Sequence, residues 1–268
     1  MKNLINELIV AGIEENEAKK EISILESEIK DKEKIKLLVK ERIKKRIPVQ
    51  YILGKAYFMD FEVKVNKKVL IPRPETEILT EETIKKLQKY AQPEIVALDI
   101  GTGSGIIAIA LAKLIPNIQI TAIDIEKEII DLACENARLN YVEDKIDFKI
   151  CDIFSKCFEK LLQSRKFDLI ISNPPYVKLN EMQKLKPEIC LHEPKIALHG
   201  SKENKTGLIY YKRIVELVKK CCDIKLLAFE IDPLLVSDLK FLLRKNGFNN
   251  FEIIKDYAKL DRCLFVYI

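Results

Sequence analysis

The spacing of hydrophobic residues changes in character along the 268-residue chain. In the first fifty residues, apolar side chains recur at intervals of three and four, which is the period of an amphipathic α-helix. The pattern breaks near Gly12 and near Asp31, and Pro48 ends it because proline cannot continue a helix. Residues 1–50 are therefore predicted to form a small domain of three to four helices.

Between residues 51 and 74 the period changes to two, as in a β-strand with one buried face. Alternating apolar residues, a polar segment at 66–68 and a second apolar run at 69–71 predict a β-hairpin that links two domains. Pro74 then starts a helix, since proline suits the first helical position and acidic residues follow it.

Residues 75–268 are predicted to form one α/β domain. Apolar runs alternate with amphipathic stretches, and runs this apolar are typical of strands covered on both faces. The pattern predicts strands at 95–100, 119–123, 145–150, 167–172, 226–231, 251–254 and 264–268. It predicts helices at 105–114, 126–140, 203–221 and 233–246. We therefore expect a doubly wound, mostly parallel seven-stranded sheet with one or two late antiparallel strands.

Composition narrows the class of protein without naming a function. A chain that is 48% hydrophobic and 32% charged can bury a core, and no apolar run approaches the roughly 20 residues that span a bilayer. We expect a cytoplasmic protein, because the N-terminus has no secretory cleavage signature. The net charge of +5 is modest for a nucleic-acid surface. The most basic stretch, 30–46, is predicted to be a solvated helix face, with an acidic protein partner as the alternative.

The cysteines do not indicate a disulfide framework or a metal site. There are seven, an odd number, and no pair has the CxxC spacing. A zinc site would need clustered ligands, and only His192 and His199 could supply imidazole groups. We predict reduced thiols and no metal.

A glycine-rich segment follows the first strand of the α/β domain and leads into a helix. Its residues are Gly101, Thr102, Gly103, Ser104 and Gly105. Glycines allow a tight turn and a close approach of a ligand to the backbone. The spacing is GxGxG rather than GxGxxG, and the preceding Asp99 suits a cationic sulfonium better than a pyrophosphate. Alone, a purely structural turn would explain the segment equally well.

Three further strand ends carry polar groups of the right kind. Asp124 ends the second strand, where a carboxylate can accept both hydroxyls of a ribose. Asp152 follows the third strand and can accept from an adenine amine, with Ile153 and Phe154 offering apolar contacts to the ring. Asn173 follows the fourth. Each aspartate alone could be a helix cap, but together the positions predict a site for S-adenosylmethionine.

The fourth strand delivers Asn173, Pro174, Pro175 and Tyr176 to the same edge of the sheet. Two prolines stiffen the loop and remove two N–H donors, so it presents acceptors, namely the Asn173 side-chain oxygen and the Pro174 carbonyl. Two acceptors would hold a planar –NH2 group and favour the charge that develops during methyl transfer. Tyr176 would pack its ring against the planar group. The alternative is a rigid surface turn.

Further segments resemble the HemK/PrmC family over nearly the whole chain. They are 46–54 (RIPVQYILG), Phe58 and Phe61, 69–77 (VLIPRPETE), 173–176 (NPPY), Glu193-Pro194 with Ala197-Leu198, and Gly207-Leu208 with Tyr210-Tyr211. The resemblance implies a class I methyltransferase fold and transfer of a methyl group from S-adenosylmethionine to the side-chain amide nitrogen of the glutamine in the GGQ motif of peptide chain release factors. It also implies that the helical domain engages the factor.

Carried over by position, the resemblance assigns cofactor contacts to Gly101–Gly105, Asp124 and Asn173, and the glutamine pocket to residues 173–176. Arg73, Glu75 and Thr76 match a segment that borders the site, although Glu75 and Thr76 could equally cap a helix. Three positions depart from the family pattern. Ile153 replaces a residue that is usually aromatic, segment 229–233 replaces the usual glycine and glutamine, and segment 200–206 alters a stretch that is usually glycine-rich.

Two other functions share parts of this pattern. A methyltransferase acting on the exocyclic amine of adenine or guanine in a nucleic acid would use the same Asn-Pro-Pro-Tyr motif, but it would need base flipping and a basic channel. An inactive protein that binds the cofactor and docks on translation factors would not need Asn173 and Asp124 intact. We expect a monomeric enzyme with a protein substrate, no stable nucleic-acid partner and no membrane association.

Overall fold

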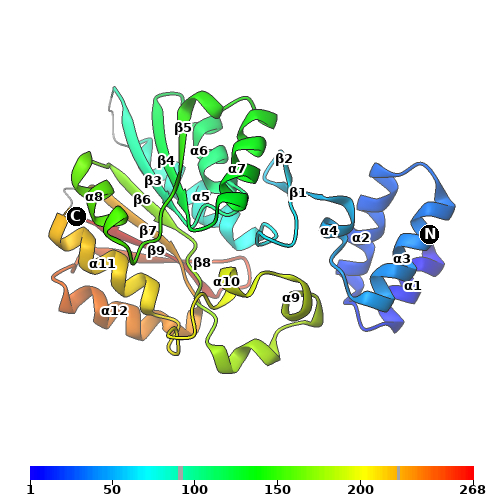
Figure 1. Ribbon diagram of the computed structural model, residues 1–268. Coiled ribbons are helices and arrows are strands. Elements are labelled where there is room, and N and C mark those ends of the chain that lie inside the picture. Colours follow the sequence, from blue (N-terminus) through cyan, green and yellow to red (C-terminus); the bar gives the residue numbers. More distant parts are fainter. Residues whose placement is uncertain (90–92, 222–223) are drawn as a thin grey trace.

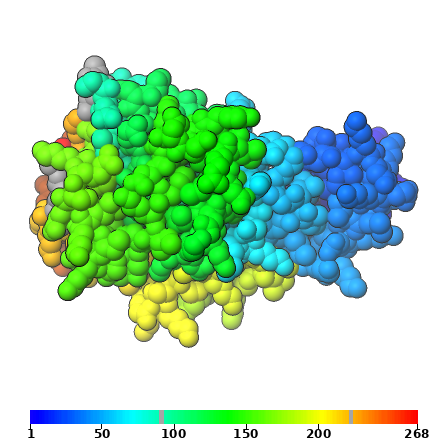
Figure 2. All heavy atoms as spheres, turned by 45° about the horizontal axis from the view of Figure 1, so that its top comes forward, coloured from blue at the N-terminus to red at the C-terminus, as the bar shows by residue number. Residues whose placement is uncertain are grey.

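The computed structural model describes residues 1–89, 93–221 and 224–268, so Cys222 lies outside the described residues. Figure 1 shows a lobe of short helices at the N-terminal end, in blue, and a larger lobe in which helices cover a central sheet. The space-filling view in Figure 2 places the N-terminal helices at one end of the molecule, with the segment around residues 50–70 between the two lobes. Within the described ranges, no helix is long and apolar enough to cross a membrane.

The helical lobe contains four helices, as its 3.6-residue period predicts. They are α1 (Lys2–Val10), α2 (Glu15–Glu28), α3 (Lys32–Lys45) and α4 (Val49–Leu53). The Asp31 side chain caps α3 by accepting from the backbone N–H groups of Glu33 and Lys34, which satisfies donors that have no partner inside the helix. Their apolar faces form a separate small core that includes Leu8, Ile22 and Val39.

The hairpin between the lobes is shorter than the sequence pattern predicts. Strands β1 (Lys55–Phe58) and β2 (Phe61–Lys64) pair in antiparallel register, and the turn lies at residues 59–60. The predicted turn at 66–68 was wrong as a hairpin turn. Asn66 does bend the chain by accepting from the Lys68 N–H, but the apolar run at 69–71 packs into the core instead of pairing as a strand.

The hairpin is attached to helix α7 (Lys127–Leu139) by side-chain amides. Asn136 accepts from the N–H of Lys64 at 2.7 Å and donates to its carbonyl at 2.9 Å, so it completes the edge of β2. Asn136 also donates to the carbonyl of Ser104 at 2.9 Å. Asn140, one turn later, donates to the carbonyl of Glu62. The hairpin is therefore fixed to the same helix that supports the glycine-rich segment.

The central sheet has seven strands in the order β5-β4-β3-β6-β7-β9-β8. They are β3 (Ile95–Ile100), β4 (Ile118–Asp124), β5 (Ile146–Ile150), β6 (Leu169–Ser172), β7 (Leu226–Glu230), β8 (Phe251–Lys255) and β9 (Asp261–Tyr267). Pairing is parallel except on both sides of β9. The strand order reverses at β3, so a crevice opens beyond its carboxyl end, where ligands bind in such sheets.

Helices cover both faces of the sheet, which confirms the doubly wound prediction (Figure 1). One face carries α5 (Pro74–Leu87), α6 (Ile106–Leu114) and α7. The other carries α8 (Lys156–Ser164), α11 (Ile209–Cys221) and α12 (Val236–Lys245). Helix α8 was not predicted. The helix predicted from residue 203 begins only at Ile209, because Gly207 adopts a left-handed φ of 78°.

The chain between β6 and α11 contains a long excursion, residues 178–206, called the 178–206 segment below. It holds the 3₁₀ helix η2 (Leu179–Lys184) and two short helices, α9 (Pro187–His192) and α10 (Lys195–Leu198). Figure 1 shows α9 extending toward the helical lobe while α10 stays beside the sheet. The segment therefore contacts both lobes.

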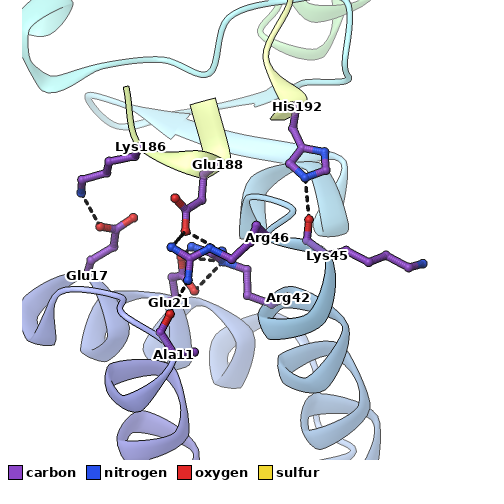
Figure 3. A network of polar contacts seen from close by, with 9 residues as sticks. All are labelled: Ala11, Glu17, Glu21, Arg42, Lys45, Arg46, Lys186, Glu188 and His192. Carbon is purple, nitrogen blue, oxygen red and sulfur yellow. Dashed lines mark hydrogen bonds and ion pairs between the residues drawn. The ribbon is translucent and has the colours of Figure 1, made fainter. Parts of the chain in front are cut away.

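A network of buried charges joins α9 to the helical lobe (Figure 3). Arg42, which is 2% exposed, donates to Glu21 at 2.8 Å and to Glu188 of α9 at 3.0 Å. Arg46 donates to the same Glu188 oxygen at 2.5 Å and to the carbonyl of Ala11. Because these charged groups are largely shielded from solvent, each requires an oppositely charged partner. The network therefore fixes α9 on helices α2 and α3.

Candidate active site

A cavity of about 350 Å³ opens beyond the carboxyl ends of β3 to β6. Its lining includes the glycine-rich segment, the loop 173–175, the ends of β4 and β5, the residues 68–73 that follow the hairpin, part of the 178–206 segment, and Tyr210 of α11. We call it the central cavity. Most predicted site residues meet here, namely Gly101, Thr102, Gly103, Ser104, Asp124, Asp152, Ile153, Asn173, Pro174 and Pro175. Gly105 and Tyr176 do not line it.

Hydrogen bonds to two carboxylates fix the conformation of the glycine-rich segment. The Asp124 carboxylate accepts from the N–H of Gly103 at 3.0 Å and from its neighbour Ile125 at 2.8 Å. Gly103 adopts a left-handed φ of 56°, which a side chain would strain. On the other side, the Thr102 hydroxyl donates to Asp99 at 2.7 Å. The turn therefore leaves its backbone facing the cavity, within reach of a ligand.

Asp99 is an incompletely satisfied carboxylate beneath this turn. Its side chain is fully buried, and its Oδ1 finds no hydrogen-bond partner in the described part of the chain. Burial raises its pKa to about 7, with the nearby Asp124 adding to the effect. Burial also raises the pKa of Asp124. Asp124 lines the central cavity, and Asp99 is bonded to Thr102 of the same wall; this pair of acidic groups favours a ligand that carries positive charge, as S-adenosylmethionine does, over an anionic one.

The cavity wall at the end of β5 combines a carboxylate with apolar groups. Asp152 accepts from the N–H of Phe154 at 2.9 Å, a local turn that sets the direction of both side chains. Ile153 is buried and lines the cavity. Phe154 lies edge-to-face against Tyr210, with ring centroids 5.5 Å apart, and both rings line the cavity. The aromatic surface that Ile153 lacks is therefore supplied by its neighbours.

Tyr210 was not predicted as a site residue, and its position depends on Gly200. An added Cβ at Gly200 would lie 1.9 Å from the Tyr210 hydroxyl, and the glycine has a φ of 71°. The 178–206 segment can thus fold over the tyrosine only with glycine at this position. Within the sequence, Tyr210 was marked only by the family segment that contains it, and nothing local relates Gly200 to a ring ten residues later.

The Asn-Pro-Pro-Tyr loop is held from several sides. Asn204, 1% exposed, donates to the carbonyl of Pro175 at 3.1 Å. The hydroxyl of Tyr176 donates to Glu230 at 3.1 Å, and an added Cβ at Gly207 would lie 2.5 Å from the Tyr176 carbonyl. Pro174 lines the central cavity, and within the described ranges no hydrogen bond reaches its carbonyl.

Asn173 lies at the end of β6, half-buried at the cavity wall. Its Nδ2 donates to the hydroxyl of Thr76 at 3.2 Å, and that hydroxyl donates to Glu230 at 2.5 Å. Helix α5 begins at Pro74, and no side chain caps its N-terminus, so Thr76 does not serve as a cap. Glu75 likewise makes no capping bond at this end. Glu230 and Thr76 thereby join the site.

Arg73 borders the cavity mouth. Its guanidinium pairs with Glu193 of the 178–206 segment, whose side chain is almost fully buried. The pair connects the start of α5 to the segment that forms the opposite wall. Burial raises the pKa of nearby Tyr51, and the Glu193 carboxylate adds to this effect. The rim is therefore built from charged groups that already have partners.

Comparison with known proteins agrees with this architecture. A family model described as a methyltransferase domain matches residues 91–198. A release factor glutamine methyltransferase from Thermodesulfovibrio yellowstonii is 39% identical over 231 residues, covering 86% of this chain and 79% of the relative. One from Chlorobaculum tepidum is 36% identical, covering 88% and 79%. A methyltransferase from Pyrococcus furiosus has the same fold, with a TM-score of 0.53 at 18% identity, covering 81% of this chain and 93% of that one.

The fold and the site define an S-adenosylmethionine-dependent methyltransferase. The residues around the central cavity suit this cofactor, since backbone at the glycine-rich segment, two acidic groups and an aromatic wall face one space. The identity to the curated relatives extends over most of both chains. The chain belongs to the release factor glutamine methyltransferase family.

Proposed function

We propose that this enzyme methylates the side-chain amide nitrogen of the glutamine in the GGQ motif of peptide chain release factors. The observation that carries the proposal is that Asn173 and Pro174, whose oxygens can accept hydrogen bonds, line the same cavity as the glycine-rich segment. Membership of the family supplies the class of substrate. Release factors act in the cytoplasm, so we propose that the enzyme works there.

An amide nitrogen is a weak nucleophile because its lone pair is delocalised. The Asn173 Oδ1 and the Pro174 carbonyl would accept its two N–H hydrogens and hold the nitrogen in line with the methyl group. As the nitrogen attacks, it becomes pyramidal and positively charged, so both hydrogen bonds strengthen in the transition state. The two prolines, with φ fixed, keep these acceptors in place before the substrate arrives.

When bound, S-adenosylmethionine supplies a methyl group on a positively charged sulfur. Asp124 would accept from the ribose hydroxyls, and Asp152 with Ile153 would contact the adenine, while residues 101–105 would lie against the amino-acid part. Alignment of the two reacting atoms supplies much of the rate enhancement. Strong basic catalysis is not needed, because the proton leaves the product nitrogen after the methyl group has transferred.

We propose three functional parts of the chain. Residues 1–50 engage the protein substrate, residues 51–74 link the domains, and residues 75–268 bind the cofactor and carry out the reaction. The charge network at Glu188 supports this division, since it joins the helical lobe to the segment that lines the central cavity. A factor bound to the helical lobe would present its glutamine to a cavity of fixed orientation.

The test is methylation of a purified release factor with S-adenosylmethionine labelled in the methyl group. We expect one label per factor, located by mass spectrometry on the GGQ glutamine, and none on a factor in which that glutamine is replaced by glutamate. RNA and DNA are incubated in parallel. Labelled nucleic acid with an unlabelled factor would replace the proposal by the nucleic-acid alternative. Asn173→Ala should abolish labelling while the protein stays folded.

A further inference from the structure

Glu230 ends strand β7 behind the Asn-Pro-Pro-Tyr loop and is 1% exposed. Its two carboxylate oxygens accept from different hydroxyls, Oε2 from Thr76 at 2.5 Å and Oε1 from Tyr176 at 3.1 Å. An ionised carboxylate can only accept hydrogen bonds. With the carboxylate ionised, both hydroxyls donate to it, and Glu230 sets the direction of each hydrogen bond; burial raises the pKa of Glu230, whereas these two hydrogen bonds lower it.

Thr76 passes this direction on to Asn173. A hydroxyl has one proton, and that of Thr76 is committed to Glu230, so its oxygen can only accept from a further neighbour. The Asn173 amide approaches this oxygen at 3.2 Å and must present its N–H side. The two ends of an amide group look alike in shape but differ in polarity, so only such a network decides which end points where. The Asn173 oxygen is therefore at the end of the amide that points away from Thr76, where it can accept a hydrogen bond.

We propose that Thr76 and Glu230 are positioning residues that set the polarity of the Asn173 amide, so that its oxygen, and not its –NH2 group, meets the substrate nitrogen. The inference rests on the proposed function, because only a substrate that donates N–H bonds requires an acceptor here. An inverted amide would place two donors against the donors of the substrate amide.

Surrounding contacts show that this arrangement is built firmly. Tyr211 is fully buried and donates to the Glu230 carbonyl at 2.7 Å, which holds the strand end. Thr76 is itself buried and lines the central cavity beside Asn173. Tyr176 donates to the other carboxylate oxygen of Glu230. Glu230 therefore holds the last residue of the 173–176 loop directly and the first residue, Asn173, through Thr76.

The experiment compares substitutions of Thr76 in the full-length enzyme, with the release factor as substrate. Thr76→Ser keeps the hydroxyl, whereas Thr76→Val removes it and keeps the shape. Thr83→Val is the matched control, because Thr83 is equally buried on the same helix but donates to the carbonyl of Leu79. We expect kcat to fall about 30- to 100-fold in Thr76→Val, while Thr76→Ser and Thr83→Val stay within about threefold of the parent.

Binding of S-adenosylmethionine and thermal unfolding are measured on the same variants. A positioning role predicts that Thr76→Val keeps the parent's cofactor Kd within about twofold and unfolds no earlier than Thr83→Val. If Thr76→Val turned over within threefold of the parent, or if Thr76→Ser lost as much activity as Thr76→Val, the inference would be overturned. Glu230→Gln allows either direction of the hydrogen bond to Thr76, so a smaller loss of about 3- to 10-fold is expected there, and parent-like turnover would exclude the carboxylate's part.

Failure of the proposed function would look different. In that case the parent enzyme itself would not label the release factor. The orientation of the Asn173 amide is then measured by NMR on the ¹⁵N-labelled protein. The side-chain –NH2 signals of Asn173 are assigned as those that disappear in Asn173→Asp. These signals should shift in Thr76→Val and stay in place in Thr76→Ser and Thr83→Val; unchanged signals in Thr76→Val would overturn the inference without any measurement of activity.

Discussion

The side chain of Asn204 donates a hydrogen bond of 3.1 Å to the carbonyl of Pro175, which lies 29 residues earlier in the chain. Asn204 also donates to the His199 carbonyl at 2.9 Å and accepts from the N–H of Ile209. One buried amide thus connects the middle of the Asn-Pro-Pro-Tyr loop to the end of the 178–206 segment and to the start of α11. This contact lies in a stretch whose sequence departs from the family pattern.

Asn204→Ala should impair both stability and turnover. It leaves one buried carbonyl, one half-buried carbonyl and one half-buried N–H without this partner, so we expect the free energy of unfolding to fall by about 2–3 kcal/mol. The loop would lose its support at Pro175, and kcat should fall about tenfold. Urea denaturation and steady-state kinetics check this. Asn249→Ala is the control, since Asn249 is exposed and its one amide contact is 3.4 Å long; equal effects in both variants would contradict the prediction.

Asp99 should make stability depend on pH. Its pKa is raised to about 7 in the folded state, so the folded protein binds a proton more tightly than the unfolded chain. The stabilisation that results is complete below about pH 4, declines as pH rises, and is lost above about pH 7. Asp99→Asn cannot ionise. The free energy of unfolding of the parent, relative to this variant, should therefore fall by about 4 kcal/mol between pH 4 and pH 8.

Urea denaturation of both proteins across this pH range is the measurement. The comparison with Asp99→Asn cancels the contributions of all groups that the two proteins share, including Asp124, whose pKa is also raised by burial. Parallel stability curves for the two proteins would show that Asp99 does not titrate in this range.

Gly200→Ala should weaken the binding of S-adenosylmethionine. Its Cβ would displace the ring of Tyr210 from the cavity wall, and we expect the Kd for S-adenosylmethionine to rise about tenfold, measured by calorimetry. Gly12→Ala separates this clash from backbone strain. Gly12 has a φ of 85° but nothing within 4 Å of an added Cβ, so this variant should lose about 1 kcal/mol of stability and keep its Kd. A Kd that rose equally in both would refute the clash.

Glu188→Gln should loosen the contact between the lobes that Figure 3 shows. The variant removes the charge that Arg42 and Arg46 share, so the buried Arg42 and the half-buried Arg46 each lose a partner, and the free energy of unfolding should fall by about 3 kcal/mol. The 178–206 segment should also be cleaved faster in limited proteolysis. Asp131→Asn breaks the exposed pair with Lys127 and should change neither property. An identical cleavage rate in all three proteins would contradict the coupling.

The order of elements and the chemistry of the site follow from local patterns. Periods of two and 3.6 residues, with glycine and proline at their breaks, predict six of the strands to within two residues and the carboxylates at their ends. The last strand, β9, begins three residues earlier than predicted, because residues 261–263 extend its pairing with β7 and β8. Helix α8 and the true hairpin turn were missed, since the first is short and the second has no glycine.

The sequence by itself determined that Asn173 would end a buried strand next to two prolines and share a sheet edge with the glycine-rich segment, because strand polarity and φ restriction act within a few residues. Only the tertiary structure decided which way the Asn173 amide faces. That depends on Thr76, 97 residues earlier, and on Glu230, 154 residues beyond Thr76. In the sequence, Thr76 is indistinguishable from a helix cap and Glu230 from an exposed acidic residue. The direction of their hydrogen bonds is fixed only because both side chains are buried in contact with each other.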